Sequence, residues 1–212
     1  MLTYVTEGLN NYTVFWDNQF NGGGMLFGPE YPKIIKELYP NRVFENCMEW
    51  CSGPGFIGYN ILDHGLAKNL LLVDVHKPAL DYAEKTKVHN GLTNVNIVEA
   101  GNISMLPSNI KVDLVVANPP HYDRVGHSDQ DENRISNDLG WKIHETFYSS
   151  IANYLTDDGI ILIQENEDGS KPEYFYEMIS NNNLTVRQVI KSKEYYTVAP
   201  NLIYYMEIVK KL

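Results

Sequence analysis

The sequence has 212 residues, of which 43% are hydrophobic and 12% aromatic, and its formal net charge is −10. This composition is typical of a globular chain with a substantial core, and the apolar runs fall well short of the roughly 18 to 20 residues that span a bilayer. The first ten residues, MLTYVTEGLN, lack the basic start and apolar middle of a signal peptide, so we expect a cytoplasmic location. The acidic balance disfavours a broad electrostatic contact with nucleic acid, although a local basic patch or a basic partner would still allow one.

From Val43 onward, short β-rich runs alternate with helical segments, a pattern typical of a parallel sheet covered by helices. In chain order, strands are expected at 43–50, 69–75, 95–99, 112–117 and 159–165. Helices are expected from about Phe56 to His64, within 77–91, within 140–155 and within 171–183. The last two β-rich runs, 184–192 and 201–210, are joined by a linker containing Pro200 that is too short for a parallel return. We therefore predict an α/β, Rossmann-like, seven-stranded, mostly parallel sheet with a C-terminal antiparallel hairpin.

Two of these helices have a predicted inward face. The capping residues Pro78 and Gly91 support the helix within 77–91. Its inward side chains are expected to be Leu80, Ala83, Lys87 and Val88. In the helix within 140–155, a spacing of four predicts an apolar stripe of Ile143, Phe147, Ile151 and Leu155.

Two regions interrupt the alternation. The N-terminal 40 residues are rich in aromatic side chains and are expected to form an extension or lid on a single domain of residues 1–212. Residues 122–139 form a polar stretch, and loops of this length are usually functional or disordered.

The side chains that bind metals do not gather in this sequence. Cys47 and Cys51 are the only cysteines, and we expect both to be reduced. His121 and His144 lie 23 residues apart with no third ligand at a suitable spacing. We therefore expect no metal site.

Three glycines follow the first expected strand, which has Glu49 near its end. Gly53, Gly55 and Gly58 would let the backbone approach a ligand closely, although a tight strand-to-helix turn explains them almost as well. Pro54 removes one backbone donor, which argues against a dinucleotide such as NAD.

The next two strands end in further polar candidates. Asp74 lies 16 residues after Gly58, a spacing at which nucleotide-binding folds place an acid on the ribose hydroxyls. A solvated acid or a helix cap is the alternative. Asn102 and Ile103 would meet an adenine ring, or Asn102 would simply form a turn.

The fourth expected strand runs into Asn118-Pro119-Pro120-His121, a rigid corner. At the carboxyl end of a parallel strand, the Asn118 side-chain oxygen and the Pro119 carbonyl could both accept hydrogen bonds from one NH₂ group. Such a clamp would orient a planar amine or amide. A loop corner is the alternative for the prolines. His121 would stack on the substrate, relay a proton or lie at the surface.

The segments EWCSGPGFIG, LLLVDVHKP, VEAGNIS and VVANPPHY resemble, in this order, the class I S-adenosylmethionine-dependent methyltransferases. They are most similar to the branch with Asn-Pro-Pro-aromatic motifs, which includes release-factor and ribosomal-protein glutamine methyltransferases. The resemblance covers about residues 25–210. It implies cofactor contacts from Phe27 in MLFGPE and from Glu49, Cys51, Gly53, Gly55, Asp74, Val75, Asn102, Ile103 and Asn118, and an acceptor site at Asn118, Pro119 and His121. Three departures are His121 in place of Tyr or Phe, Cys51 in place of Gly, and Asn102 in place of an acid.

The resemblance implies an N-methyltransferase that uses S-adenosylmethionine and acts on a planar nitrogen, with a protein amide as the first candidate. A nucleobase or a small molecule is the alternative acceptor. A non-catalytic, cofactor-binding subunit and a nicotinamide dehydrogenase are the alternatives of other classes.

Overall fold

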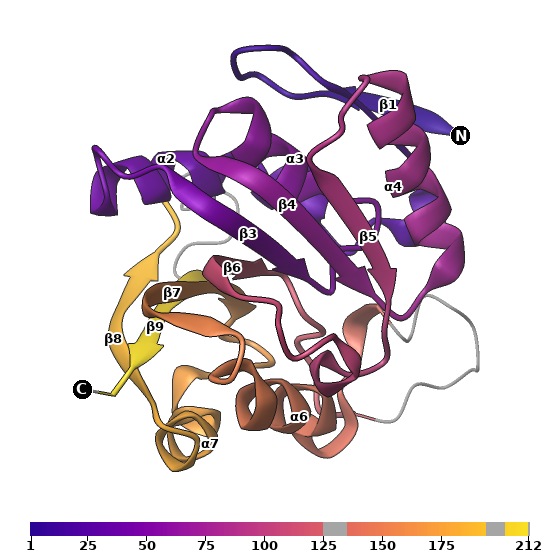
Figure 1. Cartoon of the computed structure of the whole chain (residues 1–212). Helices are drawn as coiled ribbons and strands as arrows, with labels where there is room; N and C mark the ends of the chain where they lie inside the picture. Colours follow the sequence, from indigo (N-terminus) through magenta and orange to yellow (C-terminus); the bar gives the residue numbers. More distant parts are fainter. Residues whose placement is uncertain (125–134, 194–201, 212) are drawn as a thin grey trace. The chain divides into compact units, whose positions relative to one another are not determined.

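The computed structural model describes residues 1–124, 135–193 and 202–211 (Figure 1). Most of the polar stretch 122–139 and the linker with Pro200 lie outside these residues. The chain forms two compact units, Met1–Gly101 and Asn102–Leu212, and each is described by itself.

The first unit contains three parallel strands in the order β5-β4-β3, as expected from the sequence. They are β3 (Phe44–Trp50), β4 (Ala67–Asp74) and β5 (Val95–Glu99). The helical elements of this unit are η1 (Asn18–Phe20), α1 (Gly24–Phe27), α2 (Glu30–Leu38), α3 (Phe56–Asp63) and α4 (Lys77–His89). Each expected strand and helix of this unit is present within two residues of its expected bounds, and η1, α1 and α2 are additions.

The N-terminal residues form a hairpin of β1 (Leu2–Val5) and β2 (Thr13–Trp16), which lies beside α4 (Figure 1). The Phe15 amide donates to Thr86 Oγ1 at 2.9 Å. Asn90 accepts from the Thr13 amide at 3.0 Å and donates to the Thr13 carbonyl at 2.9 Å. Hydrogen bonds to Thr86 of α4 and to Asn90, which follows its last residue, therefore hold the hairpin in place.

The second unit contains four strands in the order β6-β7-β9-β8. They are β6 (Val112–Ala117), β7 (Leu155–Asn166), β8 (Leu184–Lys191) and β9 (Ile203–Lys210). Strands β6 and β7 are parallel, whereas β9 is antiparallel to both β7 and β8, which confirms the expected hairpin. The helical elements are η2 (Ile103–Met105), η3 (Leu139–Trp141), α6 (Lys142–Ile151), η4 (Pro172–Tyr174) and α7 (Tyr176–Asn181), with α6 and α7 side by side (Figure 1). The fold is α/β, with a seven-stranded, mostly parallel sheet that ends in antiparallel strands.

Both predicted helix faces need correction. In α6 the buried side chains are His144, Phe147, Tyr148 and Ile151. Ile143 is 37% exposed, and Leu155 belongs to β7. An i, i+3, i+4, i+7 stripe follows the helix, whereas a strict spacing of four drifts around it, and His144 can face inward because carboxylates bind it. In α4, Val88 is 70% exposed and Thr86 takes the inward place, where its hydroxyl accepts the Phe15 amide.

Candidate active site

The loop between β3 and α3 has an unusual backbone. Cys51, Gly53 and Gly55 have φ of +54°, +50° and +87°, in the left-handed region that favours glycine. Gly58 is required for a different reason: a Cβ there would lie 2.7 Å from Leu70 Cδ1 and 2.8 Å from Glu49 Oε2. The glycines therefore form the turn and bring the start of α3 close to the sheet.

Glu49 is buried at the end of β3, with 2% of its surface exposed. Its Oε2 accepts from the Gly58 amide at 2.7 Å and its Oε1 from the Ile57 amide at 3.3 Å. Burial raises the pKa of Glu49 to about 8, although these hydrogen bonds oppose the shift. Glu49 thus binds the first turn of α3, and a role near the cofactor's methionine or ribose stays a prediction.

Asp74 lies at the end of β4 and binds the backbone of the loop between β3 and α3, here called the glycine loop. Its Oδ2 accepts from the Gly53 amide at 2.7 Å and its Oδ1 from the His76 amide at 2.8 Å. Burial raises the pKa of Asp74, against the effect of these two bonds. A carboxylate offers about four lone-pair sites, so ribose hydroxyls can bind to the same oxygens. Val75 follows with 66% of its side chain exposed, which suits contact with an apolar ring face. The donor and acceptor set at this strand end therefore fits the nucleoside part of S-adenosylmethionine.

The other expected cofactor residues have more ordinary surroundings. Asn102 caps η2, with its Oδ1 accepting from the Ser104 amide at 2.8 Å, and Ile103 is 1% exposed. Phe27 is half-buried at the end of α1. The cofactor roles of these three residues stay predictions.

In the second unit, Asn118 directly follows β6. Ala117 pairs with Ile163 of β7, so Glu165 lies two residues beyond the last paired position. Pro119 and Pro120 are buried, whereas Asn118 and His121 are half-buried. The proline pair therefore fixes the backbone between Asn118 and His121, beside the carboxyl ends of β6 and β7.

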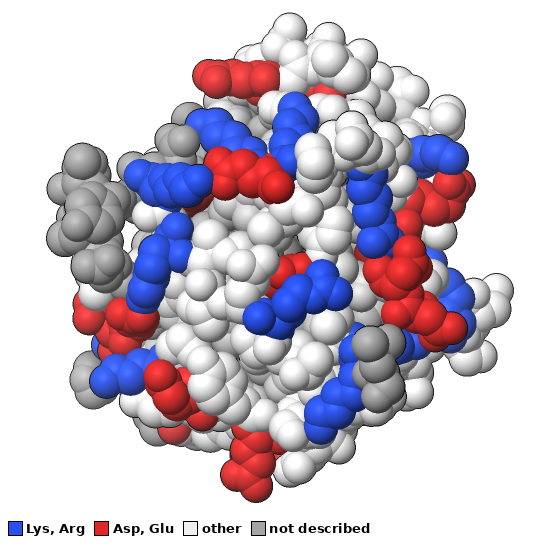
Figure 2. All heavy atoms as spheres, turned by 90° about the vertical axis from the view of Figure 1, so that its left-hand side faces the viewer, with Lys and Arg blue, Asp and Glu red and all other residues white. Residues whose placement is uncertain are grey.

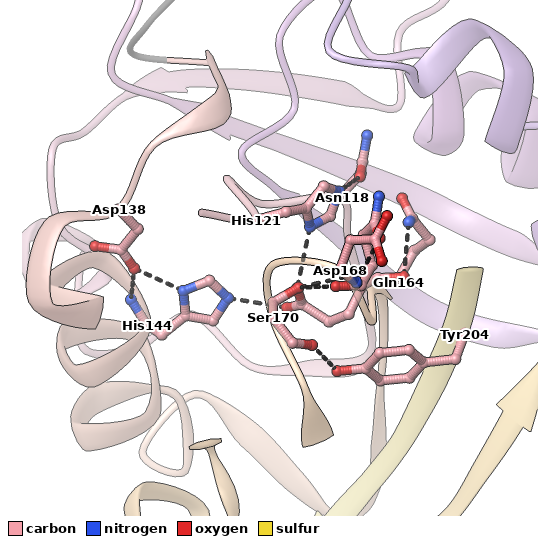
Figure 3. Close-up of polar contacts among 10 residues, drawn as sticks. Asn118, His121, Asp138, His144, Gln164, Asp168, Ser170 and Tyr204 are labelled. Carbon is pink, nitrogen blue, oxygen red and sulfur yellow. Dashed lines mark hydrogen bonds and ion pairs between the residues drawn. The ribbon is translucent and has the colours of Figure 1, made fainter. Parts of the chain in front are cut away.

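A continuous chain of hydrogen bonds runs from Asn118 into the core of this unit (Figure 3). Asn118 Oδ1 lies 3.0 Å from His121 Nε2, and His121 Nδ1 lies 3.1 Å from Glu165 Oε2. The other Glu165 oxygen lies 2.9 Å from His144 Nε2, and His144 Nδ1 lies 2.6 Å from Asp138 Oδ2. Asp138 also accepts the Ile143 and His144 amides, at 2.8 and 3.1 Å. Five side chains thus form one chain, of which the last three are buried.

The charges along this chain alternate. Burial disfavours the His144 cation, but Glu165 and Asp138 outweigh it and raise the pKa of His144 to about 9. Burial also opposes ionisation of Glu165, yet the His144 cation and the hydrogen bonds from both histidines lower its pKa below the ordinary value. At neutral pH, His144 is therefore an imidazolium between two carboxylates.

The sequence identified Asn118 and His121 but missed Glu165 and Asp138 and gave His144 no role. The sequence did hold a signal for Glu165, because this residue ends the expected strand 159–165. That strand follows the one that leads into Asn118. Asp138 belongs to the described end of the polar stretch 122–139. Among residues 1–124, 135–193 and 202–211, no group of three or more His, Cys, Asp or Glu side chains could hold a metal ion.

Known proteins are similar to this chain in sequence. Residues 32–199 match the family model of the methyltransferase small domain. The chain is 24% identical, over 158 residues, to a release factor glutamine methyltransferase of Fusobacterium nucleatum subsp. nucleatum, which covers 69% of this chain and 43% of that protein. A release factor glutamine methyltransferase of Leptospira interrogans is 26% identical over 91 residues, 42% of this chain and 32% of its own. The chain thus spans less than half the length of these curated relatives.

Two solved structures share the fold. A ribosomal protein L11 methylase from Lactobacillus delbrueckii subsp. bulgaricus superposes with a TM-score of 0.60 at 14% identity, over 93% of this chain and 81% of that one. An S-adenosylmethionine-dependent methyltransferase from Clostridium acetobutylicum gives a TM-score of 0.63 at 13% identity, over 88% and 91%. With the family model matching most of its length, the chain belongs to the methyltransferase small domain family, and it has the fold of S-adenosylmethionine-dependent methyltransferases.

Proposed function

We propose that the protein methylates a planar amide or amino nitrogen, with a glutamine-like amide of a protein as the first candidate. The observation that carries the proposal is the Asn118-Pro119-Pro120-His121 corner at the end of β6, whose Asn118 side chain is held by a hydrogen-bonded neighbour.

The role proposed for these residues is to orient the nitrogen of the methyl acceptor. S-adenosylmethionine supplies a methyl group on a positively charged sulfur, which needs no metal or covalent enzyme intermediate. A planar nitrogen is a poor nucleophile because its lone pair is delocalised. Asn118 Oδ1 and the Pro119 carbonyl would accept the two N–H groups, hold the nitrogen in place and stabilise the positive charge that develops on it.

Residues of the first unit would hold the cofactor. Asp74 would accept from the ribose hydroxyls and Val75 would cover the adenine, while Gly53 and Gly55 would give the backbone a close approach. Phe27 and Cys51 would border the same ligand, and Asn102 and Ile103, which begin the second unit, stay separate predictions of the sequence.

Two observations support a protein acceptor. Both curated relatives cited above are release factor glutamine methyltransferases. The chain carries 17 Lys and Arg against 27 Asp and Glu, and on the face in Figure 2 the two signs are interspersed, with no continuous basic patch among the described residues. Nucleic-acid binding normally relies on such a patch. No helix within the described residues is long and apolar enough to cross a membrane.

A methyl-transfer screen tests the proposal. The purified protein and methyl-tritiated S-adenosylmethionine are incubated with a cell extract that is then separated into protein, nucleic acid and small molecules. We expect label in protein that survives mild base, which would release methanol from an ester, and that strong acid hydrolysis releases as methylamine. Label in nucleic acid would identify a nucleobase acceptor, label in small molecules a metabolite, and cofactor binding without transfer in any fraction a non-catalytic subunit.

Two variants separate binding from transfer. Asn118→Ala should leave the affinity for S-adenosylhomocysteine nearly unchanged and cut transfer by about 10- to 100-fold, because it removes one of two acceptors. Asp74→Ala should instead weaken the binding of S-adenosylhomocysteine in calorimetry. The opposite pattern would contradict the proposed roles.

A further inference from the structure

The Asn118 amide is the only member of the hydrogen-bonded chain in Figure 3 that the proposed function uses directly. An amide has one accepting end and one donating end, and a half-turn exchanges them with little change in shape. Only the oxygen can accept an N–H of the methyl acceptor. Whatever decides which end of the Asn118 amide faces His121 therefore decides which end is presented to the substrate.

His121 is constrained from one side. Glu165 Oε2 lies 3.1 Å from His121 Nδ1 and can only accept when ionised, so Nδ1 must carry a proton. The side chain of Glu165 is fully buried and its other oxygen is bound by the His144 cation, so this acceptor is fixed in position. The remaining nitrogen, Nε2, carries a proton only when His121 is charged.

The two states of His121 select opposite Asn118 orientations. With His121 charged, Nε2–H would donate to Asn118 Oδ1, the atom that lies 3.0 Å from it in the structure. With His121 neutral, Nε2 has a lone pair and needs a donor, which the Asn118 Nδ2 group supplies after a half-turn. The amide oxygen is then presented away from His121.

We propose that His121 is a positioning residue that switches Asn118: when neutral and held as the Nδ1–H form by Glu165, it turns the Asn118 oxygen toward the methyl acceptor, and when charged it withdraws that oxygen. This inference rests on the proposed function of Asn118 as an acceptor clamp.

Among the described residues, charged groups near His121 come from β7, the turn after it, α6 and the residue before η3. Glu165 of β7 contacts it directly, and His144 of α6 binds the same carboxylate. Asp138, just before η3, binds His144 from the far side. Asp168, in the turn after β7, is drawn in the same close-up (Figure 3).

Nuclear magnetic resonance of the protein labelled with ¹⁵N tests the switch without any substrate. During a pH titration, we expect His121 to lose its proton from Nε2 and to keep Nδ1–H, and the Asn118 side-chain amide signals should shift in the same titration. Loss of the proton from Nδ1, or Asn118 signals that do not follow His121, would overturn the inference.

Glu165→Gln and Glu167→Gln form a matched pair. An amide at position 165 can donate as well as accept, so neutral His121 should no longer keep its proton on Nδ1 alone. Glu167 lies two residues along the chain, is partly exposed and pairs with Lys191, so its substitution should leave the Nδ1–H form of His121 unchanged. Equal effects of the two substitutions would overturn the role of Glu165.

Transfer kinetics connect the switch to function, with the labelled fraction from the screen as the acceptor. In the wild type, the rise of kcat/KM with pH should follow the loss of the His121 proton. The side chain of the Asn118→Asp variant has two accepting oxygens, so no orientation is left to select. The rise of kcat/KM with pH should therefore be about 3- to 10-fold smaller in this variant, the worth of one hydrogen bond. An identical pH profile in the two proteins would overturn the switch. The titration of His121 and Asn118 needs no turnover, so a failed methyl transfer to nitrogen would refute the proposed function while the resonance data still decide the switch.

Discussion

Asp63 at the end of α3 gives the sharpest prediction for stability, because one buried carboxylate holds the turn of the N-terminal hairpin. Its Oδ2 accepts from Thr6 Oγ1 at 2.6 Å and from the Gly8 amide at 2.8 Å. Its Oδ1 accepts from the Asn10 and Asn11 amides, at 2.6 and 3.2 Å. Asp63→Asn keeps the size of the side chain and replaces one of these oxygens with a donor.

The cost follows from which oxygen is replaced. With the new NH₂ at the Oδ2 position, Thr6 can turn its hydroxyl to accept, and only the Gly8 amide loses its partner. The Gly8 amide is only partly buried, so leaving it unpaired costs about 1 kcal/mol, and each of the three remaining bonds loses about 0.5 kcal/mol with the charge. We therefore expect Asp63→Asn to lower the free energy of unfolding by about 2 to 3 kcal/mol.

Urea unfolding followed by tryptophan fluorescence measures this change, and hydrogen exchange at Gly8 and Asn10 shows whether the hairpin opens first. Asp81→Asn is the matched control: Asp81 is exposed on α4, where solvent screens its pair with Lys77, so its loss should change stability little. A loss below about 1 kcal/mol for Asp63→Asn, or unchanged exchange at Gly8, would refute the reasoning.

Three further predictions concern the hydrogen-bonded chain around His121 and His144 and the glycine loop before α3. The pKa of His144 is raised to about 9, so its contribution of about 3 kcal/mol is present below pH about 6.5 and lost as the pH rises through 9. Urea unfolding should show this decline in the Glu49→Gln background, because Glu49, with a pKa of about 8, changes stability in the same direction; a flat profile would contradict it. Gly169→Ala brings a Cβ into collision with the His121 carbonyl oxygen and should cut methyl transfer by about tenfold with unchanged cofactor affinity in calorimetry. Gly58→Ala crowds the start of α3 and should lower the free energy of unfolding by about 2 kcal/mol in urea, and an unchanged midpoint would show that the loop relaxes freely.

The sequence predicted the sheet well because its strands are buried runs bounded by glycine, proline and acidic residues. Strand β6 was expected at 112–117 and spans Val112–Ala117. The N-terminal hairpin was missed because its strands have four residues each and are held by partners far along the chain, such as Asp63 and Thr86. Neither local periodicity nor capping residues report such contacts.

The same limit applies to the candidate site. The Asn-Pro-Pro-His motif is contiguous, so the sequence shows it directly. The bonds of Glu165 to His121 and His144 join residues 44 and 21 positions apart, across elements that only the fold brings together. His144 also shows why a buried histidine was hard to assign, since its inward place on α6 depends on two carboxylates from other segments.

The buried part of the hydrogen-bonded chain from Asn118 to Asp138 is difficult to explain by its contribution to stability alone. Asp138, His144 and Glu165 have at most 1% of their side-chain surface exposed, and burying such ions costs about as much as their attraction returns. Apolar side chains of similar volume at these positions would stabilise the unit at least as well. What apolar side chains could not supply is a fixed anionic acceptor for His121 Nδ1, which is 3.1 Å from Glu165. His121 in turn contacts Asn118. We therefore interpret the buried ions Asp138, His144 and Glu165 as the support that fixes His121, and through His121 the orientation of the Asn118 amide.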